Sequence, residues 1–77
     1  MAVLISIRKV KESSGEATYE CADDNVKFTA VVRKSDGSVM VLSDGHIVPE
    51  HVPSKVKRKL YLHWNDGQYP DVTCWAS

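Results

Sequence analysis

The residues of this chain with the greatest potential for chemistry are its cysteines and histidines. Zinc sites are built from paired ligands such as C-x-x-C and H-x-x-x-H, because closely spaced side chains converge on one ion. Neither pair occurs in the sequence, so we predict no metal site. A cysteine nucleophile beside a histidine base stays open, since such groups are assembled in space and not in sequence. The set comprises Cys21, His46, His51, His63 and Cys74.

No other motif supplies a catalytic constellation. Asp36 and Asp44 each precede a glycine, and Asp in that position is a turn-forming residue before it is a candidate acid. A chain of 77 residues also leaves little room for a substrate pocket. We therefore predict a protein without enzymatic activity, catalytic residues or a cofactor. The glycines are isolated and form no phosphate-binding loop; they are Gly15, Gly37, Gly45 and Gly67.

The stretch KVKRKLYLHW, residues 55–64, combines four positive charges with bulky side chains. In a helix, one stripe of this stretch is apolar and packs on a sheet, through Val56, Leu60, His63 and Trp64. The favoured interpretation is that the basic residues opposite this stripe only solvate the helix. The alternative is weak nucleic-acid binding, because rings and guanidinium groups stack on bases. The candidate residues for nucleic-acid binding are Lys55, Arg58, Lys59 and Tyr61.

The total charge argues against a dedicated nucleic-acid-binding protein. The chain contains 10 Lys and Arg residues and 10 Asp and Glu residues, which gives a formal net charge of zero. Such a chain creates no global positive field to attract a polyanion, whereas most nucleic-acid-binding domains are basic.

The elements that must position these residues begin with short strands. Residues 2–11, 17–21 and 26–34 alternate between two faces and are rich in β-branched or aromatic residues, which is typical of strands. Two Asp-Gly pairs, in SDGS and SDGH, predict hairpin turns. A two-residue loop at the first pair places Val32 opposite Val41. A short strand over residues 46–48 is also compatible with the pattern.

One helix is predicted after the strands, over residues 55–66. Pro49 and Pro53 prevent an earlier start, Ser54 is the predicted N-cap, and Gly67 with Pro70 ends the helix. The tail QYPDVTCWAS is aromatic enough to pack on the domain. We therefore predict a single α+β domain over residues 1–77, an antiparallel β-meander of four to five strands with one C-terminal helix packed on one face.

The N-terminal segment MAVLISIRKV predicts a cytoplasmic protein. Its apolar run ends at Ile7 and the positive charges follow it, which is unlike a signal peptide, and the run is too short to span a membrane. In the cytosol, Cys21 and Cys74 are expected to be free thiols. A disulfide between them is the alternative for a protein exported by another route.

Both ends of the chain resemble those of short hypothetical proteins of actinobacteria. The similarity lies in MAVLISIRKVKESSGEATYE and in the segment where HW runs into DGQYPDVTCWAS. These proteins begin with a similar strand and end on an aromatic residue, a proline and small residues. The resemblance implies a bacterial, cytosolic protein of unknown function and assigns no catalytic or binding residue.

The hairpin around SDGS leaves one apolar face without a predicted cover. Monomers rarely expose a contiguous apolar patch larger than a few hundred Å², so this face needs a partner or the tail. We expect a two-fold homodimer, and a non-enzymatic accessory or regulatory protein that acts through protein–protein contact. The candidate partner-binding residues are Val31, Met40, Leu42, Tyr61 and Leu62, with Ile47 as a further member of the face.

Overall fold

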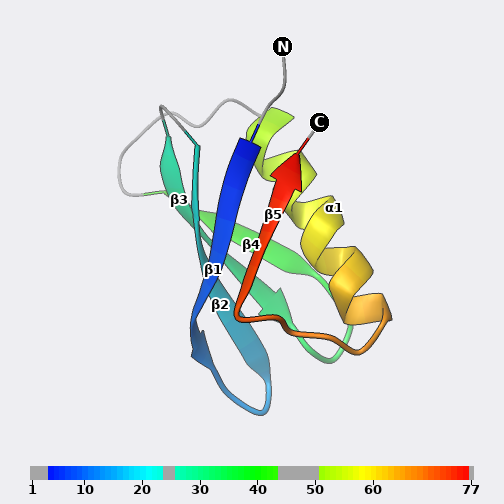
Figure 1. Ribbon diagram of the computed structural model, residues 1–77. Coiled ribbons are helices and arrows are strands. Elements are labelled where there is room, and N and C mark those ends of the chain that lie inside the picture. The colour runs from blue at the N-terminus through cyan, green and yellow to red at the C-terminus, as the bar shows by residue number, and fades with distance from the viewer. Residues whose placement is uncertain (1–3, 24–25, 44–50, 77) are drawn as a thin grey trace.

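The computed structural model describes residues 4–23, 26–43 and 51–76, which form a five-stranded antiparallel sheet and an α-helix (Figure 1). The strand order is β4-β3-β2-β1-β5, and α1 packs on one face of the sheet. The predicted α+β fold with a C-terminal helix is therefore confirmed. The elements are β1 (Leu4–Glu12), β2 (Glu16–Ala22), β3 (Lys27–Arg33), β4 (Val39–Leu42), α1 (His51–Asn65) and β5 (Val72–Ala76).

The tail forms the fifth strand of the sheet. It pairs with β1 in antiparallel fashion, with Ile5 opposite Trp75 and Ile7 opposite Thr73. Figure 1 shows β5 running between β1 and α1, and residues of β5 contact the helix. The tail thus packs on the domain as predicted, and it does so as an additional strand at the edge of the sheet. The predicted strand over residues 46–48 and the second Asp-Gly turn lie outside the described residues.

The face of the sheet that packs against α1 carries the core. Period-two alternation directs every second side chain of β2, β3 and the first half of β1 toward the helix, where it is buried. From α1, Val52, Val56 and Leu60 are buried against this face, and Trp64 is partly buried beside them. The predicted packing stripe of the helix is confirmed. The buried sheet residues are Ile5, Ile7, Ala17, Tyr19, Cys21, Phe28, Ala30 and Val32.

The turn between β3 and β4 is centred one residue earlier than predicted, and its loop comprises residues 34–37 instead of two residues. The structure pairs Val32 with Val39, whereas a two-residue loop would pair Val32 with Val41. The prediction is wrong by two residues. Because side chains alternate with a period of two, this shift leaves every residue of β4 on its predicted face.

Local hydrogen bonds explain the longer loop. The Oδ1 atom of Asp36 accepts hydrogen bonds from the backbone N–H of Ser38 at 2.9 Å and from its hydroxyl at 2.8 Å. The N–H of Gly37 donates to the carbonyl of Arg33 at 2.8 Å, which closes a wider turn than a two-residue loop. Gly37 has a φ of 75°, a conformation that glycine adopts without a Cβ penalty.

The helix begins about one turn before the predicted start, so Ser54 is inside α1 and is not its N-cap. Pro53 therefore lies in the first turn. A proline is tolerated there because the N–H groups of the first turn have no partner within the helix.

The helix ends as predicted, near Gly67. Gly67 has a φ of 71°, its N–H donates to the carbonyl of Trp64 at 2.9 Å, and the N–H of Gln68 donates to the carbonyl of His63 at 2.9 Å. These two bonds define a Schellman motif, which satisfies the last carbonyls of the helix.

Candidate interaction surfaces

The open face of the sheet, opposite α1, brings three of the predicted partner-binding residues together. Val31 on β3 pairs with Met40 on β4, and Leu42 follows on the same side of β4. Met40 and Leu42 are 54% and 50% exposed, and Val31 is half-buried between them and β2. We call Val31, Met40 and Leu42 the β4 patch.

A shallow hollow lies at one end of the β4 patch. Its volume of about 30 Å³ is the space of about one water molecule, so it is far smaller than a substrate pocket. The residues that line it are Glu16, Val31, Arg33, Ser38 and Met40. The shape of the β4 patch is therefore that of a nearly flat contact surface, not that of a ligand pocket.

Two more exposed apolar residues, one at each end of the β1–β5 ladder, lie on the open face at the opposite edge of the sheet. Leu4 on β1 and Val72 on β5 are 60% and 72% exposed. The polar middle of the sheet, where Arg8 and Glu20 form an exposed ion pair at 3.4 Å, separates these two residues from the β4 patch. Neither residue is among the predicted partner-binding residues; the tail around Val72 was the alternative cover of the open face. The alternation of β1 places Leu4 with Ser6 and Arg8, and this signal was sufficient to find it.

Tyr61 and Leu62, the other two predicted partner-binding residues, lie on α1 and are 48% and 46% exposed. They occupy the solvent side of a helix that packs on the face opposite the β4 patch. The structure thus divides the five candidates between two surfaces.

The ring of Tyr61 rests on a fixed neighbour. Its centroid lies 5.5 Å from that of Trp64, with the planes inclined by 35°. The Nε1–H of Trp64 donates to the carbonyl of Lys34 at 2.8 Å, and its ring lies directly over Gly37. The loop between β3 and β4 therefore holds Trp64 in place, and Trp64 supports Tyr61.

The predicted nucleic-acid-binding residues lie along the first half of α1. Arg58 is exposed, whereas Lys55 and Lys59 are half-buried at the margin of the packing face. Lys57, which sequence reasoning left out, is exposed beside Arg58. Because the helix begins at His51, these cations lie beyond its first turn, where the unfavourable effect of the helix dipole has largely decayed.

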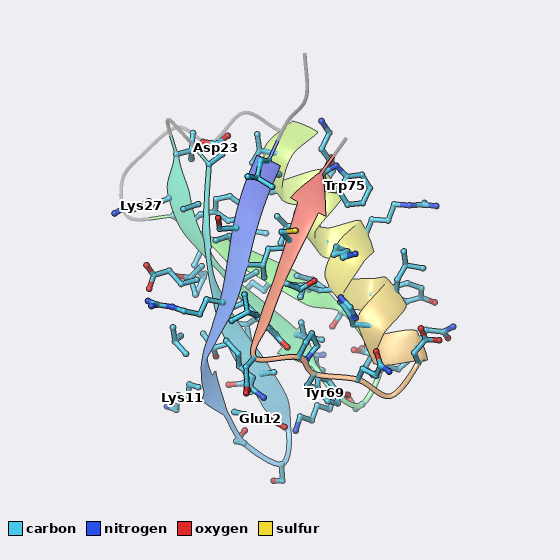
Figure 2. The ribbon with its side chains drawn as sticks, viewed as in Figure 1. Lys11, Glu12, Asp23, Lys27, Tyr69 and Trp75 are labelled. Atoms are coloured by element: carbon cyan, nitrogen blue, oxygen red, sulfur yellow. The ribbon has the colours of Figure 1, made fainter. Side chains whose placement is uncertain are left out.

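A cluster of charges ties the end of β1 to the β3–β4 loop. Glu12 contacts two ammonium groups, Lys9 Nζ at 2.5 Å and Lys34 Nζ at 2.6 Å. Lys9 also lies 3.1 Å from Oδ1 of Asp71 and donates to the carbonyl of Tyr69 at 3.0 Å. Figure 2 shows Glu12 and Tyr69 at the same end of the sheet. This cluster joins three segments that are distant in sequence.

The two ammonium groups shift the acid–base properties of this cluster. Hydrogen bonds from Lys34 and Lys9 lower the pKa of Glu12 from 4.5 to about 2. The same contacts raise the pKa of Lys9, with Glu12 the larger cause and Asp71 the smaller. All members of the cluster satisfy one another, which is typical of a structural ion-pair network.

The cysteines are free thiols, as predicted, and they lie on opposite faces of the sheet. Cys21 is buried on the helix-facing side opposite Ile7, and burial raises the pKa of its thiol to about 12. Cys74 is exposed on the open face opposite Ser6. Since the two side chains point away from each other, they do not form a disulfide in this fold.

The histidines add no cluster that resembles a metal or catalytic site. Nε2 of His63 lies 3.1 Å from Oγ1 of Thr73, a contact that joins α1 to β5. Residues 4–23, 26–43 and 51–76 contain no group of three or more His, Cys, Asp or Glu side chains placed to hold a metal ion. His46 lies outside the described residues, as do Asp44 and Gly45.

Within the part of the chain that the structure describes, no helix is long and apolar enough to cross a membrane. Comparison of the chain with protein families, curated proteins and solved structures finds no match. The resemblance of the chain ends to short actinobacterial proteins stays a prediction.

Proposed function

We propose that this protein is a non-enzymatic interaction protein that self-associates as a two-fold dimer through β4. The observation that carries the proposal is the β4 patch, which lies next to an edge of the sheet. The proposal includes a cytosolic accessory or regulatory role, in which the dimer is the acting form.

The edge position of β4 supports pairing with a second strand. The carbonyl of Ser38 accepts a hydrogen bond from the N–H of Arg33, so backbone groups at this position point toward β3. In an antiparallel ladder this direction alternates, and the N–H and C=O groups of Val39 and Val41 therefore point outward. Outward groups on an edge strand are a template for pairing with another chain.

The symmetry of a dimer limits the register of this pairing. Residues directly opposite each other in an antiparallel pair lie on the same face, so the registers that pair apolar residues place Met40 opposite Met40 or Leu42 of the second copy. In either register, the β4 patches of both copies become one continuous apolar surface. A two-fold axis also closes the assembly, whereas contact between β4 and β5 of another copy would continue into a filament.

The side chains around this edge favour self-pairing. Proteins commonly protect an edge strand with lysines, prolines or inward charges. The strand β4 has the sequence VMVL, which contains none of these. At the other edge, the exposed carboxylate of Asp71 directly precedes β5. The two edges therefore differ in the protection that their own residues provide.

The test is the mass of the protein in solution at micromolar concentration, measured by light scattering. We expect a dimer for the native sequence and a monomer for Met40→Lys, because a charge at the centre of the patch opposes pairing. Val72→Lys is the matched control, since it adds the same charge on the same face at the other edge, and it should remain dimeric. A monomeric native protein, or equal loss in both variants, would refute the proposal.

A further inference from the structure

Four of the six cations in the sheet and its loops are paired with acidic residues, whereas Lys11 and Lys27 form no ion pair with another described residue. In the sheet and its loops, Arg8, Lys9, Arg33 and Lys34 each lie within 4 Å of a carboxylate. The helix α1 contains four cations and no acidic residue, and none of the four forms an ion pair with another described residue. These residues are Lys55, Lys57, Arg58 and Lys59. A neutral chain thus carries a local excess of positive charge on one element.

The packing of α1 on the sheet determines how far each of these four cations is exposed to solvent. Val52 is three residues before Lys55 and seven before Lys59, so the three lie on one side of the helix. Because Val52 is buried, the stems of both lysines lie along the core margin and their ammonium groups extend to solvent. Lys57 and Arg58 project from the exposed side. The four cations of α1 are therefore distributed around the solvent side of the helix and its margins, within about one and a half turns.

An aromatic ring lies next in line on this surface. Tyr61 is three residues after Arg58, so their side chains are neighbours on the helix surface. The ring is half exposed, and it is supported from below by Trp64, which the β3–β4 loop holds in place. An exposed ring with a fixed support is pre-organised for stacking, because little motion is lost when a planar group binds.

We infer that this surface of α1 binds single-stranded nucleic acid. The four cations contact phosphates, and a base stacks on Tyr61 beside the guanidinium group of Arg58. A single strand is favoured over a duplex because only an unpaired base offers its face to the ring. An acidic peptide without aromatic residues, such as polyglutamate, would satisfy the cations but would offer no ring to stack on Tyr61. This site lies apart from β4 and does not depend on the proposed dimer.

The charge count sets the expected salt dependence. For a single strand, each neutralised phosphate changes the slope of log K against log salt by about −0.7. Four contacts give a slope of about −3, so binding weakens by roughly 50-fold between 50 and 200 mM salt. The interaction is therefore measured at low ionic strength.

The experiment uses fluorescence anisotropy with a labelled thymidine oligonucleotide of about 12 nucleotides. Lys57→Glu combined with Arg58→Glu should weaken binding at least about tenfold at 50 mM salt. Lys11→Glu combined with Lys27→Glu is the matched control, because it changes the net charge equally at two exposed lysines of the sheet. Figure 2 shows both of these lysines pointing away from α1. The control should bind within about twofold of the native protein.

The role of the ring is tested separately from the charges. Tyr61→Ala should weaken binding by about tenfold, and an abasic oligonucleotide of the same length should bind about as weakly to the native protein. Circular dichroism checks that each variant is folded, and light scattering checks that it keeps the native mass. Equal binding of the abasic strand, tighter binding of a duplex, or tighter binding of polyglutamate than of the oligonucleotide would overturn the inference. Equal losses in the helix variant and the lysine control would do so as well.

Discussion

Gly37 connects the β3–β4 loop to the helix, and its substitution by alanine offers a quantitative test of the packing. A Cβ atom at this position would lie 2.4 Å from Cε3 and 2.6 Å from Cδ2 of Trp64, distances at which the ring must move. Alanine would also be strained at a φ of 75°, which costs about 1–2 kcal/mol. Gly37→Ala therefore combines a conformational penalty with a steric one.

The steric part follows from what Trp64 would lose. Displacement of its ring weakens the 2.8 Å hydrogen bond to the carbonyl of Lys34, worth about 1 kcal/mol, and overpacking adds about 1 kcal/mol or more. We expect Gly37→Ala to reduce the free energy of unfolding by about 3 kcal/mol. For a domain of this size, each kcal/mol lowers the melting temperature by roughly 4–8 °C.

Gly67 supplies a matched control for this substitution. Its φ of 71° is nearly the same, but nothing lies within 4 Å of a Cβ built on it. Gly67→Ala should cost only the conformational penalty of about 1 kcal/mol. The entropy that alanine removes from the unfolded chain is common to both variants and cancels in the comparison.

Urea unfolding followed by circular dichroism measures both variants against the native protein. If Gly37→Ala and Gly67→Ala differ by less than about 0.5 kcal/mol, the contact between the loop and Trp64 does not contribute as we describe. Gly15→Ala is a further reference, since that glycine has neither a positive φ nor a neighbour within 4 Å of the added atom, and it should be close to neutral.

Two further predictions concern titratable groups. Because the pKa of Glu12 is about 2 in the folded protein, below its ordinary value of 4.5, its contribution to stability is present above pH 4.5 and is lost as the pH falls toward 2. The stability difference between the native protein and Glu12→Gln, measured by urea unfolding, should therefore be largest near neutrality and vanish near pH 2; a difference independent of pH would contradict this. A thiol reagent should modify Cys74 rapidly in the folded protein, whereas buried Cys21, with its raised pKa, should react only after unfolding. Rapid modification of two thiols per chain, detected by mass spectrometry, would show that Cys21 is accessible.

The faces of the strands and the packing stripe of the helix could be predicted from the sequence because they depend on local periodicity. Val56 and Leu60 on α1, and Phe28 and Val32 on β3, lie where their spacing places them. The prediction that Met40 lies on the open face is correct although the predicted register is wrong, because the register error is an even number of residues.

The features that sequence reasoning missed depend on contacts between distant segments. Nothing local in residues 72–76 identifies β1 as their partner, so the sequence predicts a packed tail around Val72 and Trp75 but not its place at the edge of the sheet. Lys57 is exposed because of the orientation of α1 about its own axis, which its packing on the sheet sets. Val52 joins the buried stripe only because the helix starts early, and this turns Lys55 and Lys59 toward the core margin.

The pairing of β5 with β1 has a consequence for the order of folding. The strands β1 to β4 each pair with their neighbour in sequence, so their contacts close short loops. The contact between Leu4 and Ala76 instead closes nearly the whole described chain, and loop-closure entropy makes such a contact slow to form. During synthesis, the outer edge of β1 therefore lacks its partner until β5 has left the ribosome. For that interval the nascent chain has two open sheet edges next to exposed leucines, one at Leu4 and one at Leu42, and this is the stage at which it is most prone to aggregate.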